Sequence, residues 1–268
     1  MMNISRALRA AVAALAIAVA TTIAATPATA APLPTVVLVH GAFADSSSWD
    51  GVAAQLRARG YSVVTPENPL RGPANDAAAI QRTLDAIAGP VVLVGHSYGG
   101  TVISNVHDPK VESLVYIAAF APVRGEFAQL ALDPIRFPGS QLLPPALQLK
   151  IVDDPRGLAG RNLDAFVAPD RFHDVFAQDV TPETAAQMSA RQHSIAVVAN
   201  LEPSGPPSWA DTPSWYLVSG EDRVIPASSE RFMAQRMGAT TSEIPASHAS
   251  LVSHPTEVAE LVESAAAH

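Results

Sequence analysis

Apolar runs alternate with amphipathic segments from about residue 35 to the end of the chain. Six short runs rich in valine, leucine, isoleucine and aromatic residues predict strands at residues 35–39, 61–65, 91–94, 114–119, 215–219 and 242–245. Segments with helical spacing predict helices near residues 49–59, 76–88, 97–107, 228–237 and 255–265. This alternation is typical of parallel strands joined by crossover helices. We therefore expect a doubly wound α/β fold with a six-stranded, all-parallel sheet.

The alternation is interrupted between the fourth and the fifth predicted strand. Residues 121–213 contain 12 of the 23 prolines and five of the eight phenylalanines, and no run typical of a strand. Helices are predicted there at residues 163–178 and 182–200. An insertion at this place projects over the carboxyl ends of the strands, where open α/β sheets bind ligands. We expect residues 31–120 and 214–268 to form the core and residues 121–213 to form a helical cap or lid. The alternative is an excursion that covers one edge of the sheet.

The first thirty residues have the pattern of a signal peptide. Arg6 and Arg9 precede an uninterrupted apolar stretch over residues 10–23, and Ala28 and Ala30 are the small residues that a signal peptidase requires. The apolar stretch is also long enough to cross a bilayer, so a permanent membrane anchor is the alternative. Its alanine-rich composition and the prolines that follow it favour cleavage after about Ala30. We therefore predict an exported protein, secreted or periplasmic.

Charge and composition narrow the range of partners and cofactors. Removal of residues 1–30 leaves 15 basic and 25 acidic side chains, a formal net charge of −10. Such a surface repels nucleic acid and anionic membranes, so we expect neither as a partner. The absence of cysteine excludes disulfides, a thiol nucleophile and a thiolate metal site. No metal-ligand spacing, Walker loop or dinucleotide motif is present, and we predict no cofactor and no metal. The oligomeric state is left open.

A candidate nucleophile follows the third predicted strand, in the segment Gly95-His96-Ser97-Tyr98-Gly99. A serine at the tip of such a strand–turn–helix is directed outward, with its hydroxyl at the mouth of a parallel sheet. The two glycines lack a Cβ atom, which lets neighbouring strands lie close to a strained turn. The helix that begins behind the serine offers unpaired N–H groups to a developing negative charge. We predict a nucleophilic serine, the alternative being an ordinary turn serine.

A serine hydroxyl is a poor nucleophile at neutral pH and requires a base within hydrogen-bond distance. Among eight histidines, His248 follows the last predicted strand and so emerges at the carboxyl end of the sheet. His40 and His96 adjoin glycines, and we expect them to support the backbone. The remaining histidines lie at helix ends, in the predicted cap or at the end of the chain. His248 is therefore the predicted base.

The base in turn requires an acid, which should follow the preceding strand. Asp222 comes two residues after the glycine that ends that strand, a spacing that turns a carboxylate inward. Its neighbour Glu221 and the more distant Glu126 are the alternatives. Ser97, Asp222 and His248 then occur in the chain order of Ser…Asp…His hydrolases, each after a strand.

The negative charge that forms on a reacting carbonyl oxygen requires two backbone donors. The N–H of Tyr98, directly after the nucleophile, is the first candidate. The second is the N–H of Ala42, in the loop that follows the first predicted strand. Phe43 comes next, and we predict that it forms a wall of the acyl pocket, a position in the core being the alternative.

Four segments, at residues 37–43, 95–100, 220–226 and 247–249, resemble the α/β-hydrolase superfamily. The resemblance covers the chain from about residue 31. It is strongest to compact members with a small cap, which include plant methylesterases, hydroxynitrile lyases and many actinobacterial esterases. The lyases in this group place a lysine directly after the catalytic histidine, where this chain has Ala249. Dehalogenases and epoxide hydrolases of this fold use an aspartate nucleophile, where this chain has Ser97.

The sequence therefore predicts an exported serine hydrolase that cleaves carboxylic esters through an acyl-enzyme. The five phenylalanines of residues 121–213 suit a cap that covers an apolar group of a small-molecule ester, or they form the cap's own core. A small-molecule binding protein with vestigial activity is the first alternative. A lyase or perhydrolase that uses the same triad is the second.

Overall fold

Six parallel strands form the central sheet of the computed structural model, which describes residues 32–268. In spatial order they are β2 (Val63–Val64), β1 (Thr35–Val39), β3 (Val91–His96), β4 (Val111–Ile117), β8 (Ser214–Ser219) and β9 (Thr240–Ile244). Every neighbouring pair is parallel. The prediction of six parallel strands is confirmed. The predicted signal peptide lies outside the described residues.

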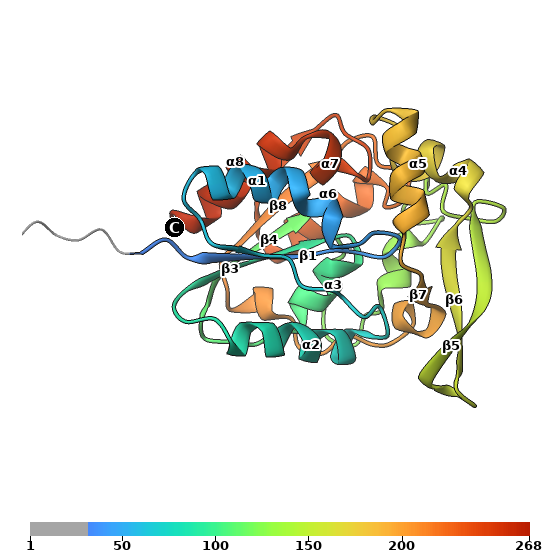
Figure 1. Ribbon diagram of the computed structural model, residues 1–268, viewed down its shortest axis with the longest axis horizontal. Coiled ribbons are helices and arrows are strands. Elements are labelled where there is room, and N and C mark those ends of the chain that lie inside the picture. Colours follow the sequence, from blue (N-terminus) through green and yellow to red (C-terminus); the bar gives the residue numbers. More distant parts are fainter. Residues whose placement is uncertain (1–31) are drawn as a thin grey trace, which may run out of the picture. The chain divides into compact units, whose positions relative to one another are not determined.

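Helices cover both faces of this sheet (Figure 1). They are α1 (Asp50–Ala58), α2 (Pro73–Asp85), α3 (Tyr98–Ser104), α6 (Ala227–Met237), α7 (Ser250–Ser253) and α8 (Pro255–Ala266), with 3₁₀ turns at Ser46–Trp49, Ala128–Leu132, Val197–Asn200 and Ser208–Ala210. Successive strand residues point to opposite faces. In β1, Val37 and Val39 pack with residues of α2, α3 and α6, whereas Val36 and Leu38 pack with residues of α1 and α8. Both faces are therefore buried, as in other parallel sheets.

The segment between β4 and β8 contains helices and a second sheet. Its helices are α4 (Pro169–Phe176) and α5 (Pro182–Arg191), and its antiparallel sheet has the order β5 (Leu147–Leu158), β6 (Arg161–Val167), β7 (Ile195–Ala196). Both predicted helices are present but shorter than expected. The expectation that residues 121–213 contain no strand was wrong, so a purely helical cap is an incomplete description. We call residues 121–213 the cap.

The missed strands have a physical explanation. In β5, Leu147, Leu149 and Ile151 alternate with polar residues, which is a strand period, but the run soon meets a proline within the strand. Leu149 and Ile151 are exposed, so burial does not enforce the alternation. Pairing with β6 decides the structure instead, and that partner lies across a turn in the sequence.

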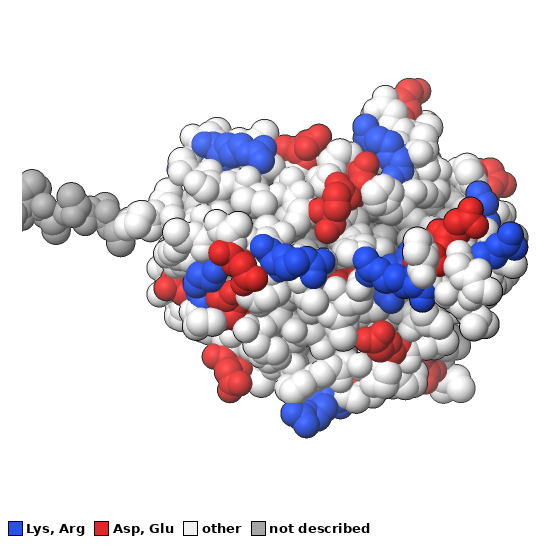
Figure 2. Space-filling model, turned by 60° about the horizontal axis from the view of Figure 1, so that its bottom comes forward, with Lys and Arg blue, Asp and Glu red and all other residues white. Residues whose placement is uncertain are grey.

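The cap elements gather at the carboxyl ends of the core strands (Figure 1). Residues 33–268 form one compact unit. Acidic and basic side chains are interspersed over the face that Figure 2 shows. Within residues 32–268, no helix has both the length and the apolar character needed to span a bilayer.

Candidate active site

Ser97 occupies a sharp turn between β3 and α3. Its backbone has φ 54° and ψ −123°, a strained conformation for a residue with a side chain. The turn requires glycine neighbours, because a Cβ atom at Gly41 would lie 2.6 Å from Cβ of Ser97. A Cβ atom at Gly99 would lie 2.5 Å from the Val39 carbonyl oxygen. This close packing holds the serine at the carboxyl end of the sheet.

The structure brings the three predicted catalytic side chains together. Nε2 of His248 lies 2.9 Å from Oγ of Ser97, and Nδ1 of His248 lies 2.5 Å from Oδ2 of Asp222. The other carboxylate oxygen of Asp222 accepts hydrogen bonds from the N–H groups of Val224, at 2.6 Å, and Ile225, at 2.9 Å. With Nδ1–H donating to the carboxylate, the lone pair of Nε2 faces the serine hydroxyl. This is the arrangement that a general base requires.

The rival acids lie elsewhere. Glu126 accepts hydrogen bonds from the guanidinium of Arg236, at 2.7 and 3.0 Å. Glu221 is exposed, and the contact that it makes with the cap goes through its backbone oxygen, which accepts a hydrogen bond from Gln178. Asp222 is thus the carboxylate that His248 contacts.

The other two buried histidines near the site hold its backbone. His96 donates from Nε2 to the His248 carbonyl oxygen at 2.9 Å, and burial lowers the pKa of His96 well below its ordinary value. His40 donates from Nδ1 to the Gly41 carbonyl oxygen and accepts from the Asn68 N–H at Nε2. Burial also lowers the pKa of His40. Both rings are therefore neutral at pH 7.

Two backbone N–H groups beside the serine are without protein partners. Within the described residues, neither the N–H of Ala42 nor that of Tyr98 donates a hydrogen bond to another protein group. The next residue, Phe43, adopts a positive φ of 61°, and its N–H donates to the His193 carbonyl oxygen of the cap at 2.9 Å. The Tyr98 hydroxyl donates to buried Asp76 at 2.9 Å. The two free donors are those that the sequence predicted for an oxyanion.

Aromatic side chains of the cap cover the histidine. Phe176 of α4 meets the His248 ring edge to face, with 4.8 Å between ring centroids. Phe172 lies 4.9 Å from Phe176, and Phe43 meets Phe176 at 6.4 Å. The i, i+4 spacing of the two cap phenylalanines is the sequence signal for this shared face. Ser97 is only 4% exposed.

A surface cleft opens beside this cover. It lies between the loop after β1 and helix α5, and its lining includes Phe43, Asp45, Met188 and Arg191. Phe43 also contacts Phe176, which contacts His248. Two aromatic rings in contact therefore connect the lining of the cleft to the histidine.

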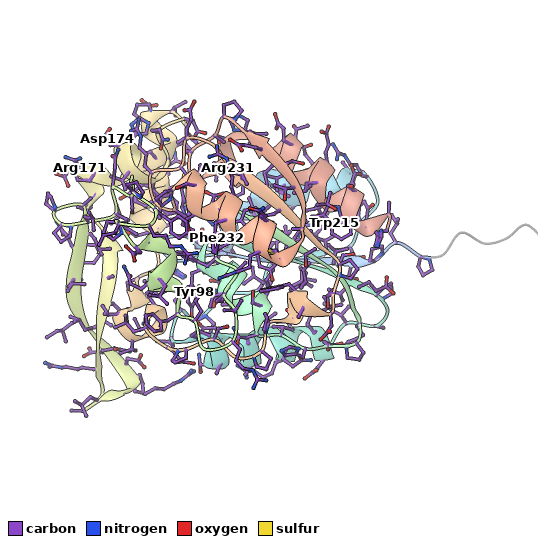
Figure 3. The ribbon with its side chains drawn as sticks, turned by 180° about the vertical axis from the view of Figure 1, so that it is seen from behind. Tyr98, Arg171, Asp174, Trp215, Arg231 and Phe232 are labelled. Atoms are coloured by element: carbon purple, nitrogen blue, oxygen red, sulfur yellow. The ribbon has the colours of Figure 1, made fainter. Side chains whose placement is uncertain are left out.

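The cap also holds the loop that carries His248. The carboxylate of Asp179, just after α4, accepts a hydrogen bond from the Ser247 N–H at 2.8 Å and one from the Ser253 hydroxyl at 2.8 Å. Another contact between the cap and the core is made by Arg223, whose guanidinium donates to the carbonyl oxygen of Asp174, a residue labelled in Figure 3. Nothing in the sequence distinguishes Asp179 from other loop aspartates.

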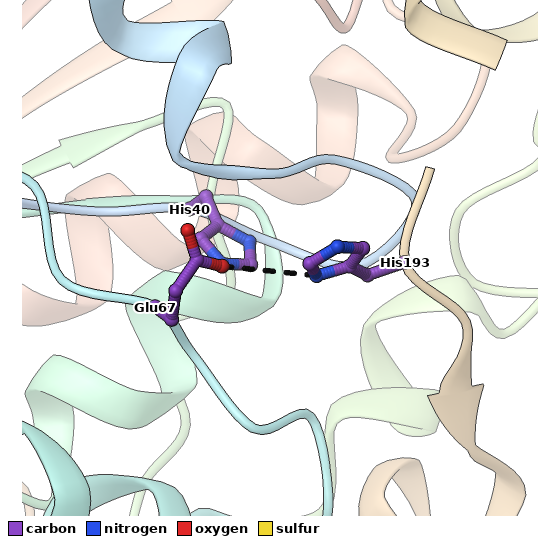
Figure 4. A group of neighbouring side chains, drawn as sticks. All are labelled: His40, Glu67 and His193. Atoms are coloured by element: carbon purple, nitrogen blue, oxygen red, sulfur yellow. Dashed lines mark ion pairs between the residues drawn. The ribbon is translucent and has the colours of Figure 1, made fainter. Parts of the chain in front are cut away.

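A cluster of His40, Glu67 and His193 joins cap and core nearby (Figure 4). Their potential ligand atoms lie within 4.8 Å of one another. Nε2 of His40, however, accepts the Asn68 N–H at 3.0 Å, which occupies the lone pair that a metal ion requires. The contact between Nδ1 of His193 and Glu67, at 3.8 Å, is exposed. The cluster is therefore a polar contact between cap and core.

A buried acid, which the sequence patterns did not predict, lies behind the site. Glu230 of α6 is 0% exposed, and its Oε2 accepts the Ser219 N–H at 3.0 Å. Its side chain also lies within hydrogen-bond distance of the Asp222 carboxylate. Burial, and then the negative charge of Asp222, raise the pKa of Glu230 well above its ordinary value.

Known proteins share this arrangement of elements. A model of the alpha/beta hydrolase family matches residues 36–261. The chain belongs to this family. A pyrethroid hydrolase of Sphingobium wenxiniae is 28% identical over 251 residues, a match that covers 85% of each chain. A carbendazim hydrolyzing esterase of a Nocardioides species is 38% identical over 117 residues, covering 38% of this chain and 48% of that one.

The solved structures include a methylesterase from Arabidopsis that matches this α/β hydrolase with a TM-score of 0.69 and 16% identity, over 88% of this chain and 99% of that one. At this identity the likeness concerns the fold, and it agrees with the predicted resemblance to plant methylesterases. The predicted enzyme class, a carboxylic ester hydrolase, is confirmed at this level of description.

Proposed function

We propose that this α/β hydrolase is an exported serine esterase in which Ser97 is the nucleophile, His248 the general base and Asp222 its partner. The observation that carries the proposal is the hydrogen-bonded series from Ser97 through His248 to Asp222, with 2.9 and 2.5 Å between the atoms. Three groups far apart in sequence lie in the order that nucleophilic catalysis requires.

The proposed reaction proceeds in two halves. His248 takes the proton of Ser97 as Oγ attacks the ester carbonyl carbon, while Asp222 stabilises the imidazolium. The free N–H groups of Ala42 and Tyr98 receive the oxyanion. His248 then protonates the leaving alcohol, which leaves an acyl group on Ser97. Water, activated by the same histidine, releases the acid and restores the serine.

The aromatic surroundings favour esters with an apolar acyl or aromatic group. Phe43, Phe172 and Phe176 form an apolar layer beside His248, and Phe43 also lines the surface cleft. The relatives named as a pyrethroid hydrolase and a carbendazim hydrolyzing esterase support this class of substrate. For export, the support is the pattern of the first thirty residues, and the N-terminal sequence of the secreted protein tests cleavage after Ala30.

The Ser97→Ala variant tests the proposal on p-nitrophenyl esters. Loss of the nucleophile should lower kcat by about 10⁴-fold or more, with little change in thermal stability. Ser113→Ala is the matched control, because this buried serine also makes a hydrogen bond, at 2.8 Å to the Ala265 carbonyl oxygen, at the far end of the sheet. Near-full activity of Ser97→Ala would remove the serine from the mechanism.

Two further measurements distinguish the alternatives. A fluorophosphonate probe should label Ser97 covalently in the wild-type protein. A protein that binds small esters without being labelled would be a binding protein instead. Cleavage of cyanohydrins without cleavage of p-nitrophenyl esters would identify a lyase, which Ala249 in place of a lysine disfavours.

A further inference from the structure

Two buried carboxyl groups lie side by side behind the catalytic histidine. Glu230 reaches the Asp222 carboxylate within hydrogen-bond distance, and both side chains are shielded from water. No ion pair between Glu230 and a lysine, arginine or histidine occurs in residues 32–268. Its neighbour Arg231 points outward on α6 and pairs with Glu243 at 2.5 Å (Figure 3). Two adjacent carboxylates without a cation do not both ionise in such a site.

The hydrogen bonds decide which of the two carries the charge. Asp222 accepts three N–H donors, from Val224, Ile225 and His248. Glu230 accepts one, from Ser219, and its second oxygen, Oε1, accepts no hydrogen bond from the described residues. Three donors stabilise an anion more than one donor does. The charge therefore belongs to Asp222 and the proton to Glu230.

We propose that Glu230 is a neutral carboxylic acid that donates its O–H to the Asp222 carboxylate and so positions the acid of the triad. The inference rests on the proposed function, because the positioned group acts through His248. Glu230 joins the end of β8, through Ser219, to the loop after that strand, through Asp222. A buried acid that donates to a carboxylate fixes its orientation without adding a second charge.

Two substitutions separate this role from a merely structural one. In Glu230→Gln, the amide oxygen accepts the Ser219 N–H and the amide N–H donates to Asp222, so both contacts are retained. In Glu230→Met, both contacts are lost at similar volume. With a p-nitrophenyl ester we expect kcat of Glu230→Gln within about twofold of wild type, and kcat of Glu230→Met lower by about 3- to 10-fold with KM unchanged. Circular dichroism establishes the fold of each variant.

Infrared spectroscopy measures the protonation state without any turnover. The wild-type protein at neutral pH should show the carbonyl stretch of a protonated carboxylic acid, and Glu230→Gln should lack it. Glu221→Gln is the matched control, since it removes an exposed carboxylate next to Asp222 and should leave the band in place. If Glu230→Met does not fold, this infrared band and the activity of Glu230→Gln still test whether Glu230 is a neutral acid that positions Asp222.

Three results overturn the inference. They are the absence of the band from the wild-type protein, a loss of kcat in Glu230→Gln as large as in Glu230→Met, and wild-type kcat in a folded Glu230→Met. A protein that shows the band but whose Ser97 is not labelled by the fluorophosphonate retains the neutral acid and refutes the proposed esterase. The two failures are thus distinguishable.

Discussion

A neutral Glu230 in the folded protein makes stability depend on pH in a defined direction. Its pKa is raised by burial and by the charge of Asp222, whereas in the unfolded chain a glutamate titrates near about 4.3. Between these two values the folded state binds one more proton at this site than the unfolded state. The free energy of unfolding therefore falls as pH rises, by about 1.4 kcal/mol per pH unit from this group. In Glu230→Gln this contribution is absent.

The predicted effect is large enough to measure. While Glu230 stays protonated in the folded protein, the stability of Glu230→Gln relative to wild type should increase by about 1.4 kcal/mol per pH unit, or about 2.8 kcal/mol over the two units from about pH 5.5 to about pH 7.5. For a chain of this size that corresponds to roughly 5–10 °C in the difference between melting temperatures. Urea denaturation of both proteins at each pH measures it. Groups that titrate in both proteins cancel in the comparison.

The charged and titratable groups that face Glu230 are shared by both proteins. They are Asp222, Tyr216 and Glu243, while Arg231 pairs with Glu243 on the outer side of the helix. Burial raises the pKa of Tyr216, so that tyrosine stays neutral across the range measured. Glu221→Gln supplies the control, because it removes an exposed carboxylate next to Asp222 and leaves the buried pair intact. A flat or falling difference for Glu230→Gln would show that Glu230 is ionised in the folded protein.

Two other predictions concern the turn that carries Ser97. Tyr98→Phe removes the hydroxyl that donates to buried Asp76, so the free energy of unfolding should fall by about 1.5–3 kcal/mol. Activity should persist, because the backbone N–H of residue 98 remains. An unchanged free energy of unfolding in urea would show that this hydrogen bond does not stabilise the protein. Gly41→Ala places a Cβ atom 2.6 Å from Cβ of Ser97. If the variant folds, its kcat should be at least tenfold lower, which corresponds to an increase of about 1.4 kcal/mol in the activation free energy. Turnover close to that of the wild type would contradict the close packing at this turn.

The core and its candidate site could be predicted, because the buried strands and the turns that carry the site residues have short, recognisable sequence patterns. Strand β3 is buried on both faces, so residues 91–94 form a continuous apolar run, and the strained turn after it requires glycine two residues before and two residues after Ser97. Asp222 and His248 each follow the carboxyl end of a strand, and parallel strands bring those ends to one edge of the sheet. The positions of these side chains therefore follow from topology.

Glu230 could not be predicted in this way. It lies in the segment Ser229-Glu230-Arg231, where two charged residues are adjacent on an amphipathic helix. Only the rotation of α6 against β8 decides that Glu230 is fully buried while Arg231 faces solvent. The strands of the cap were missed for a related reason, since their pairing partners rather than their own burial define them.

The contacts of the cap indicate that it holds the groups of the proposed active site in place as well as covering them. Its His193 carbonyl oxygen holds Phe43 in a positive-φ conformation next to Ala42, and such a conformation persists only where neighbouring groups restrain it. Its Asp179 carboxylate holds the Ser247 N–H, one residue before His248. Phe176 packs against the ring of His248 itself. The loops that carry Ala42 and His248 are thus both held by one inserted segment, so the docked position of the cap and the order of the proposed catalytic groups depend on the same contacts.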